Sequence, residues 1–182
     1  VRSRGLGDVY KRQCKNYTHQ TKYVLPIPPS PNLPDMKSIY LYPATCYFEA
    51  TPVSLGRGTS LPFQVYGHPN MTGYNYSFTP KSIPGAKNPP QLNKLCHGVN
   101  LSNMSNEEIW ERGVDLSYVI DAYKNLNMGD HFFRPFFELL VGTDYVRKMI
   151  EDGKSAGEIK SRWKGDVEKF KEQRKPYLLY QE

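Results

Sequence analysis

The chain has 182 residues, of which 38% are hydrophobic and 23% are charged, and its formal net charge is +6. This length can bury a hydrophobic core and suits one domain with at most a small appendage. The 14 tyrosines, 8 phenylalanines and 2 tryptophans exclude a disordered chain, and the lack of a run of about 18 apolar residues excludes a membrane-spanning helix.

The positive charge is confined to the two ends of the chain. Residues 1–13 have a net charge of +3, residues 145–182 carry ten basic and seven acidic side chains, and residues 14–144 carry ten of each. The charges of the C-terminal segment alternate in sign, which is typical of a solvated helix face rather than of a track for phosphates. No nucleic-acid-binding motif accompanies them, so the sequence predicts no nucleic-acid partner.

The first two segments of the chain lack the patterns of folded elements. Residues 1–13 have no apolar periodicity and lack the apolar region of a signal peptide, and we interpret them as a non-native leader. Residues 14–36 are polar and then rich in proline, which predicts an extended connector because proline cannot join a helix interior or a central strand. Residues 37–182 are expected to form the domain.

Aromatic and β-branched residues dominate the chain from residue 37 to about residue 102, and glycines and prolines divide them into short runs. Such runs predict β-strands with turns between them. The expected strands are Ser38–Tyr42, Thr45–Thr51, Pro62–Tyr66, Tyr74–Thr79 and Gly98–Ser102, with a proline-rich loop at Lys81–Lys94.

After residue 105 the apolar periodicity becomes helical. Three helices are expected: one with the stripe Leu116, Val119, Ile120 and Tyr123, one from an N-cap at Thr143–Asp144 to Gly153, and one after the capping box of Ser155 and Glu158. A last edge strand is expected at Tyr177–Tyr180. The predicted fold class is therefore α+β, a small strand-rich sheet or partial barrel followed by about three helices that pack on it.

The cysteines and histidines do not form a recognisable metal site. Cys14, Cys46 and Cys96 form no CxxC pair, and His68 and His97 lie in predicted loops without metal-ligand spacing to a partner. A Cys46–Cys96 disulfide and two buried thiols both fit the sequence. Since there is also no P-loop and no dinucleotide fingerprint, the sequence predicts no metal and no cofactor.

One carboxylate stands alone in the strand-rich half. Within residues 36–106 the only acidic residue is Glu49, and Arg57 follows between two glycines, which permit a backbone with positive φ. Arginine binds carboxylates through paired hydrogen bonds, so Arg57 suits a ligand carboxylate or Glu49 itself. Two interpretations stay open: a ligand-binding site, or a structural Glu49–Arg57 ion pair that fixes a loop, with Thr59 as a turn hydroxyl.

A series of motifs in a fixed order supports a more specific interpretation. It comprises PSPNLP at 29–34, YPATC at 42–46, FEAT at 48–51, GRGT at 56–59, PFQ at 62–64, CHGV at 96–99, LVGTD at 140–144, Trp163 and YLLY at 177–180. In this order the motifs resemble the C-terminal domain of the NamZ-type exo-β-N-acetylmuramidases over residues 26–182. Two positions depart from that family: Ala50 stands where glycine is expected, and Pro52 where asparagine is usual.

The resemblance implies a bacterial glycoside hydrolase that releases N-acetylmuramic acid from the non-reducing end of peptidoglycan fragments. It also implies a Rossmann-like domain before this one, which is missing here, an active site in the cleft between the two domains, and a secreted or periplasmic location. The expected partners are then a peptidoglycan-derived saccharide and the missing domain, and the 182-residue chain alone is expected to be inactive.

The resemblance also directs attention to the residues near the cleft. Glycoside hydrolysis usually needs two carboxyl groups, and Glu49 is the only one in the strand-rich half, so the second is expected from the missing domain. Glu49 and Arg57 are the catalytic candidates. Arg57 also suits the lactyl carboxylate of N-acetylmuramic acid. Asn32, Thr59 and Gln64 are the predicted substrate-binding residues. The alternative function is a non-catalytic module that binds glycans or docks on another domain.

Overall fold

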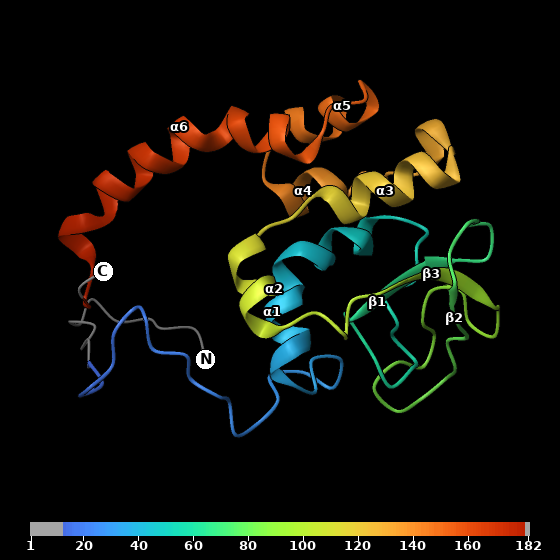
Figure 1. Ribbon diagram of the computed structural model, residues 1–182, viewed down its shortest axis with the longest axis horizontal. Helices are drawn as coiled ribbons and strands as arrows, with labels where there is room; N and C mark the ends of the chain where they lie inside the picture. Colours follow the sequence, from blue (N-terminus) through green and yellow to red (C-terminus); the bar gives the residue numbers. More distant parts are fainter. Residues whose placement is uncertain (1–12, 181–182) are drawn as a thin grey trace, which may run out of the picture. The chain divides into compact units, whose positions relative to one another are not determined.

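The computed structural model describes residues 13–180, so the predicted leader lies outside the described residues apart from Gln13. Contacts divide the described chain into two compact units, residues 25–163 and a smaller unit of residues 13–24 with 164–180. Helix α6 (Ala156–Arg174) contributes to both units. The larger unit contains the β-sheet and the other α-helices (Figure 1).

The larger unit is α+β, as predicted, with a small antiparallel sheet in the N-terminal half and most of its helices after the sheet. The described sheet has three strands in the order β1 (Val65–His68), β3 (Cys96–Asn100) and β2 (Tyr76–Phe78). β2 lies inside the strand predicted at 74–79, and β3 overlaps the strand predicted at 98–102 but begins two residues earlier. These two strand predictions are confirmed.

The strands predicted at Ser38–Tyr42 and Thr45–Thr51 are wrong, because residues 36–50 are helical. They form α1 (Met36–Thr45) and the 3₁₀ helix η1 (Cys46–Ala50). Asp35 caps α1: its carboxylate accepts the Ser38 N–H at 2.7 Å, and the Ser38 hydroxyl approaches the Asp35 N–H in return. Positions 41, 44, 45 and 48 are buried, which is the spacing of a helix face, and this spacing outweighs the strand-like composition.

Two other strand predictions also need correction. In Pro62–Tyr66, residues up to Gln64 form a turn closed by the Gln64 N–H donating to the Leu61 carbonyl oxygen, and β1 begins only at Val65. The expected edge strand at Tyr177–Tyr180 is absent from the described chain. A 3₁₀ helix, η3 (Lys175–Tyr177), with a proline in its first turn, occupies the start of that segment.

The three predicted helices are present as α3 (Ser117–Leu126), α5 (Tyr145–Glu151) and α6. The predicted capping box at the start of α6 is confirmed, since the Ser155 hydroxyl accepts the Glu158 N–H at 3.2 Å and the Glu158 carboxylate accepts the Ser155 N–H at 2.8 Å. Three short elements escape sequence prediction: α2 (Asn106–Arg112), α4 (Phe137–Val141) and η2 (Gly129–His131).

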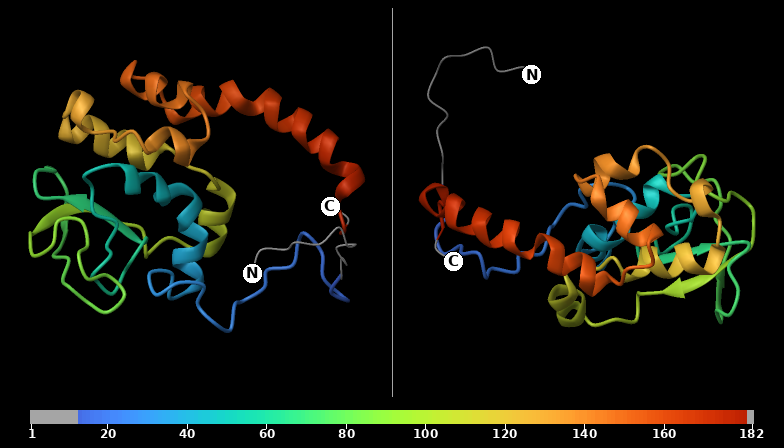
Figure 2. Two further views of the ribbon diagram at one scale, coloured as in Figure 1. Left: turned by 180° about the vertical axis from the view of Figure 1, so that it is seen from behind. Right: turned by 90° about the horizontal axis from the view of Figure 1, so that it is seen from above.

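The hydrophobic core of the larger unit lies mainly between α1, η1, α3 and α4. Its largest fully buried side chains include Phe48, Phe132 and Phe137. Figures 1 and 2 show α3, α4 and α5 stacked along one side of the unit, with α1 and the sheet beside each other beneath them. Tyr66 of β1 joins this core, whereas its neighbour Val65 points to the opposite face of the sheet, where it packs in a second, small cluster.

A partly buried carboxylate connects the sheet to α3. Asp121 Oδ2 accepts hydrogen bonds from the hydroxyls of Tyr66 and Tyr74, both at 2.8 Å. Tyr66 is 2% exposed, and burial together with the nearby Asp121 charge strongly raises the pKa of its hydroxyl. The phenol therefore keeps its proton and remains a donor to Asp121 throughout the physiological pH range.

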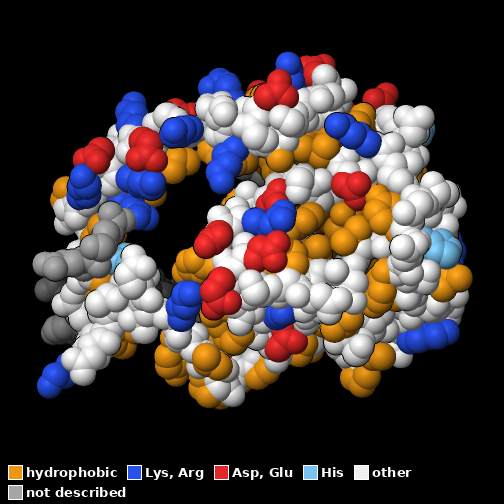
Figure 3. All heavy atoms as spheres, viewed as in Figure 1, with side chains coloured by type: hydrophobic (Ala, Val, Ile, Leu, Met, Phe, Trp, Pro, Cys, Tyr) orange, Lys and Arg blue, Asp and Glu red, His pale blue; other side chains and the backbone are white. Residues whose placement is uncertain are grey.

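The smaller unit brings the two ends of the described chain together. The Cys14 N–H donates to the Tyr180 hydroxyl at 2.7 Å, and the Tyr17 and Tyr180 rings lie 5.2 Å apart. Basic and acidic side chains alternate along α6, as predicted for a solvated face (Figure 3), and Lys171 pairs with Glu168 at 2.9 Å. Within residues 13–180 no helix combines the length and the apolar character that crossing a bilayer requires.

We predict that Tyr66→Phe lowers the free energy of unfolding by about 1.5–3 kcal/mol, because Asp121 loses one of two donors to a charged acceptor. Urea denaturation followed by circular dichroism measures this change. Tyr76→Phe is the matched control in the same sheet, since the Tyr76 hydroxyl makes no hydrogen bond within the described chain. Equal losses in the two variants would contradict a role for the Asp121 network.

Candidate functional site

Glu49 lies near the end of η1, on a turn that buried hydrogen bonds hold in place. The Thr51 hydroxyl donates to the Phe48 carbonyl oxygen at 2.8 Å and accepts the Val53 N–H at 3.2 Å. Ala50, which departs from the family motif, is fully buried, and its carbonyl oxygen accepts the Arg134 N–H at 2.9 Å. These contacts fix the backbone on both sides of Glu49 and leave its side chain partly exposed.

Arg57 is presented by a turn that only glycines can form on either side. Gly56 has φ +74° and Gly58 has φ +82°. A Cβ at Gly56 would lie 2.5 Å from the Leu61 carbonyl oxygen, and one at Gly58 would lie 2.3 Å from the Lys81 carbonyl oxygen. The predicted positive φ is confirmed. The close approach that the glycines permit is to the chain's own backbone, which packs the turn tightly.

Glu49 and Arg57 form an ion pair, with 2.6 Å between Arg57 Nη2 and Glu49 Oε1. The Glu49 side chain is 24% exposed and that of Arg57 is 35% exposed. The Arg57 guanidinium lies 5.2 Å from the centre of the Phe63 ring. Its Nε is buried and has no hydrogen-bond partner within the described chain. One side of the guanidinium is therefore held by Glu49, while another donor is left without an acceptor.

Two aromatic residues support the guanidinium. Phe63 is 1% exposed and has φ +60°, a left-handed conformation that costs a residue with a Cβ about 1–2 kcal/mol. Tyr42 packs on Phe63, with ring centroids 5.1 Å apart. Burial, followed by the charge of Glu49, raises the pKa of the Tyr42 hydroxyl, so this group is a protonated donor beside the ion pair.

The ion pair opens onto a pocket of about 140 Å³. Apart from Glu49 and Arg57, its walls are apolar; they are formed by Phe48, Val53, Leu55, Pro90 and Phe136. Two charged groups at an apolar hollow are typical of a small-molecule site, but the volume lies below the roughly 300–1,000 Å³ of pockets that enclose a drug-sized ligand. The described residues therefore form a shallow wall rather than a closed site.

The structure places the other three predicted site residues outside this pocket wall. The Asn32 amide donates to the Gly85 carbonyl oxygen at 3.0 Å, and the Thr59 hydroxyl donates to the Gly56 carbonyl oxygen at 2.6 Å. Gln64 is 3% exposed and donates to Asp35 Oδ2 at 2.9 Å. Each of these polar groups has a partner within the chain, and only the Thr59 hydrogen bond lies in the turn that presents Arg57.

The cysteines and histidines do not join the pocket. Cys46 and Cys96 are free thiols with pKa values raised by burial to about 11. Burial and the charge of Lys94 lower the pKa of His68. His97 Nδ1 lies 2.9 Å from the Ser77 hydroxyl oxygen at the sheet surface. Among the described residues no cluster of His, Cys, Asp and Glu could hold a metal ion.

The sequence alone does not predict that Tyr42, Phe63 and Phe136 contribute to this site. The sequence does not predict the left-handed conformation of Phe63, because that conformation depends on the tertiary packing of the turn. Phe136 reaches the pocket from the segment before α4, more than 80 residues from Glu49, so no local motif marks it. The motif YPATC includes Tyr42 and is the one signal that could have drawn attention to it.

Comparisons with known proteins show which family the chain resembles. The pattern described as "Exo-beta-N-acetylmuramidase NamZ, C-terminal" matches residues 40–180. The chain is 34% identical over 165 residues to the peptidoglycan beta-N-acetylmuramidase NamZ of Bacillus subtilis, a match that covers 84% of this chain and 40% of that protein. The chain thus spans less than half of this curated relative.

Two solved structures of DUF1343 family proteins from Bacteroides fragilis are also similar. One is 83% identical with a TM-score of 0.91, over 92% of this chain and 48% of that one. The other is 20% identical with a TM-score of 0.60, over 85% of this chain and 45% of that one, and it supports the fold alone.

We predict that Glu49→Gln accelerates alkylation of Cys46. Burial is the main cause of the raised Cys46 pKa, and the Glu49 charge is the next. Removing that charge lowers the pKa, so more of the reactive thiolate is present at pH 8–9. Mass spectrometry after timed iodoacetamide labelling measures the rate. Cys96 is the internal control, because its raised pKa has no contribution from Glu49; an unchanged Cys46 rate would contradict the described proximity.

Proposed function

Since the chain belongs to the NamZ exo-β-N-acetylmuramidase C-terminal family, we propose that it forms one wall of the active-site cleft of a peptidoglycan glycoside hydrolase. The proposed reaction releases N-acetylmuramic acid from the non-reducing end of peptidoglycan fragments. The observation that carries the proposal is the Glu49–Arg57 ion pair at the mouth of an apolar pocket. It puts a carboxylate and a partly exposed guanidinium at one accessible hollow.

Glu49 is the proposed catalytic carboxylate of this wall. Glycoside hydrolases usually place two carboxyl groups on either side of the bond that breaks. The pocket has only one acidic side chain among its described lining residues, so the second acid comes from outside this wall in our proposal. In a protein as long as the relatives, the proposed source of this second acid is the expected Rossmann-like domain.

Arg57 is the proposed binding group for the lactyl carboxylate of N-acetylmuramic acid. A guanidinium has five N–H donors, and Glu49 accepts from only one of its nitrogens. The Arg57 side chain is 35% exposed, so guanidinium donors that Glu49 does not use are open to a ligand carboxylate in this proposal. Asn32, Thr59 and Gln64 contribute to substrate binding in this proposal by holding the surrounding loops.

The proposal extends to the organisation and location of the protein. Residues 37–182 act as the C-terminal domain after a connector at residues 14–36, and the chain is inactive without its partner domain. A substrate in the cell wall places the enzyme in the periplasm or outside the cell. The chemistry proposed for Glu49 and Arg57 uses only side-chain carboxyl and guanidinium groups and water.

We predict that Glu49→Gln lowers kcat on a chromogenic N-acetylmuramide by at least about 10²-fold, the range for loss of a catalytic acid or base. The assay uses a chimera in which this chain replaces the matching segment of the 83%-identical Bacteroides fragilis protein, so that a full-length relative carries the site.

Glu111→Gln is the control for this variant, since Glu111 is an exposed carboxylate on α2 outside the pocket. Its turnover is expected to equal that of the unchanged chimera. Full turnover in Glu49→Gln would remove Glu49 from the mechanism, and a folded chimera without N-acetylmuramidase activity would argue against the proposed reaction.

We predict that Arg57→Lys in the same chimera raises KM about tenfold with a smaller effect on kcat, because a lysine cannot make the paired hydrogen bonds of a guanidinium to a carboxylate. Steady-state kinetics with N-acetylmuramide and N-acetylglucosaminide substrates measures the effect. The KM for the glucosaminide, which lacks the lactyl carboxylate, is expected to be the same in both proteins. Equal increases for both substrates would contradict the assigned contact.

Because Glu49 is the one acidic residue among the described pocket residues, an alternative function is a glycan-binding module without catalytic activity. That module would bind muramic-acid saccharides saturably as the 182-residue chain and would need no further domain. Calorimetric titration of the chain with a muramic-acid disaccharide, combined with the turnover assay of the chimera, distinguishes the two. Binding by the chain together with an inactive chimera favours the module, whereas turnover by the chimera favours the hydrolase.

A further inference from the structure

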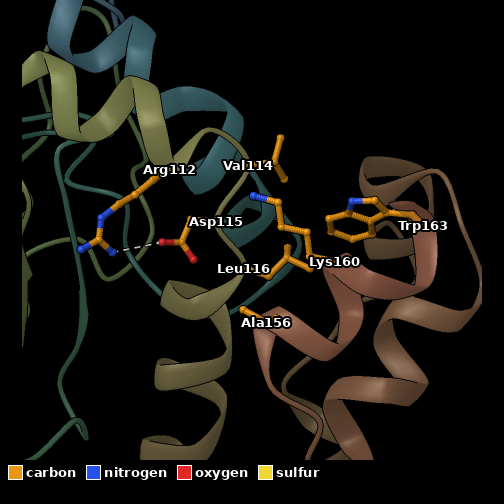
Figure 4. Close-up of a pocket in the computed structure, with 8 residues that line it drawn as sticks. Arg112, Val114, Asp115, Leu116, Ala156, Lys160 and Trp163 are labelled. Carbon is orange, nitrogen blue, oxygen red and sulfur yellow. Dashed lines mark hydrogen bonds and ion pairs between the residues drawn. The ribbon is translucent and has the colours of Figure 1, made fainter. Parts of the chain in front are cut away.

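A second cavity lies in the larger unit and shares no lining residue with the pocket at Glu49. Its volume is about 210 Å³, and it lies between the turn that joins α2 to α3 and the first two turns of α6 (Figure 4). Its lining residues are Arg112, Val114, Asp115, Leu116, Ala156, Gly157, Lys160 and Trp163. Nothing in the proposed reaction uses this cavity.

One side of the cavity is an aromatic surface. Trp163 is half-buried and packs against the hydrophobic core, and Leu116 forms a buried apolar floor. In Figure 4 the side chains of Trp163 and Lys160 project into the same space. The indole N–H donates to no atom of the described chain. A half-exposed indole offers both a flat apolar face, on which the C–H face of a sugar ring stacks, and a polar donor at its edge.

The charged groups of the cavity differ in whether they have partners within the described chain. Asp115 Oδ1 accepts the Ser117 N–H at 2.8 Å, and Oδ2 accepts from Arg112 Nη1 at 3.2 Å. Arg112 also pairs with Glu108 at 3.2 Å. Lys160, by contrast, has no ion pair or hydrogen bond with any described residue. The free group at the cavity is therefore an ammonium with three donors, and it matches a ligand with an anionic acceptor.

We propose that this cavity binds one carboxylate-bearing sugar residue, with its ring on Trp163 and its carboxylate on the Lys160 ammonium. The site follows from these residues, and only the choice of N-acetylmuramic acid as the sugar rests on the proposed function. The volume of about 210 Å³ suits one sugar residue rather than several. The cavity gives the chain a second point of attachment to a glycan, separate from the Glu49–Arg57 site.

The fluorescence of Trp163 reports binding directly. The chain has 2 tryptophans, so Trp110→Phe leaves Trp163 as the single reporter, and phenylalanine keeps a ring against Tyr40. Titration of this 182-residue variant with N-acetylmuramic acid is expected to give a saturable change. Adding Lys160→Met is expected to raise Kd about tenfold or more, because a charge-assisted hydrogen bond is lost while the aliphatic stem remains. N-acetylglucosamine, which lacks the carboxylate, is expected to bind with the same weakened affinity.

The matched control is Lys169→Met, which removes a lysine of the same helix outside the cavity and is expected to leave Kd unchanged. A signal that does not saturate, or an equal Kd in Lys160→Met, overturns the site. Equal affinity for the two sugars overturns the carboxylate contact, and binding of an alanyl peptide carboxylate in place of the saccharide overturns the sugar assignment. Because the readout needs no turnover, its failure is distinct from a failure of the proposed function, which would be an inactive unchanged chimera or full turnover in Glu49→Gln.

Discussion

Three left-handed residues, Gly56, Gly58 and Phe63, set the position of Arg57, and the candidate site depends on them. The two glycines pack their α-carbons against backbone oxygens, and the Phe63 N–H donates to the Leu55 carbonyl oxygen at 2.8 Å. The turn is thereby held by backbone contacts on both sides of the arginine. The ion pair with Glu49 forms on a loop whose backbone is already fixed, so little further backbone entropy is lost when it forms.

Packing in the hydrophobic core connects the candidate site to the sheet and to α3. Phe48, next to Glu49, is 1% exposed and stacks on Tyr66 with ring centroids 4.8 Å apart. Tyr66 in turn donates to Asp121 of α3. A continuous path of packed rings and one partly buried carboxylate, Asp121, thus connects the site to the sheet and to a helix. Burial against the core, rather than the ion pair, determines where the backbone of Glu49 lies, since a partly exposed ion pair contributes at most about 1 kcal/mol.

Local signals in the sequence predict some elements and miss others for identifiable reasons. The capping box of Ser155 and Glu158 is a short-range pattern, so the start of α6 follows from it directly. Residues 36–50 contain many strand-forming side chains, and only the cap at Asp35 and the spacing of buried positions reveal the helix. Glu49 and Arg57 are identified by their isolation, but the apolar walls of their pocket come from distant segments. Trp163 is identified from the sequence only as part of the motif series, and its place at a cavity depends on the α2–α3 turn, which no local pattern reveals.

The shape of the turn around Arg57 does not depend on the charge of Glu49. The glycines, the Phe63 backbone and the Thr51 hydrogen bonds all act without the carboxylate. A gene that exchanges Glu49 for a neutral residue of similar size therefore still encodes the same folded loop and the same pocket. In the proposed mechanism, a single nucleotide change that encodes glutamine at position 49 therefore separates glycan recognition from turnover while the fold is kept.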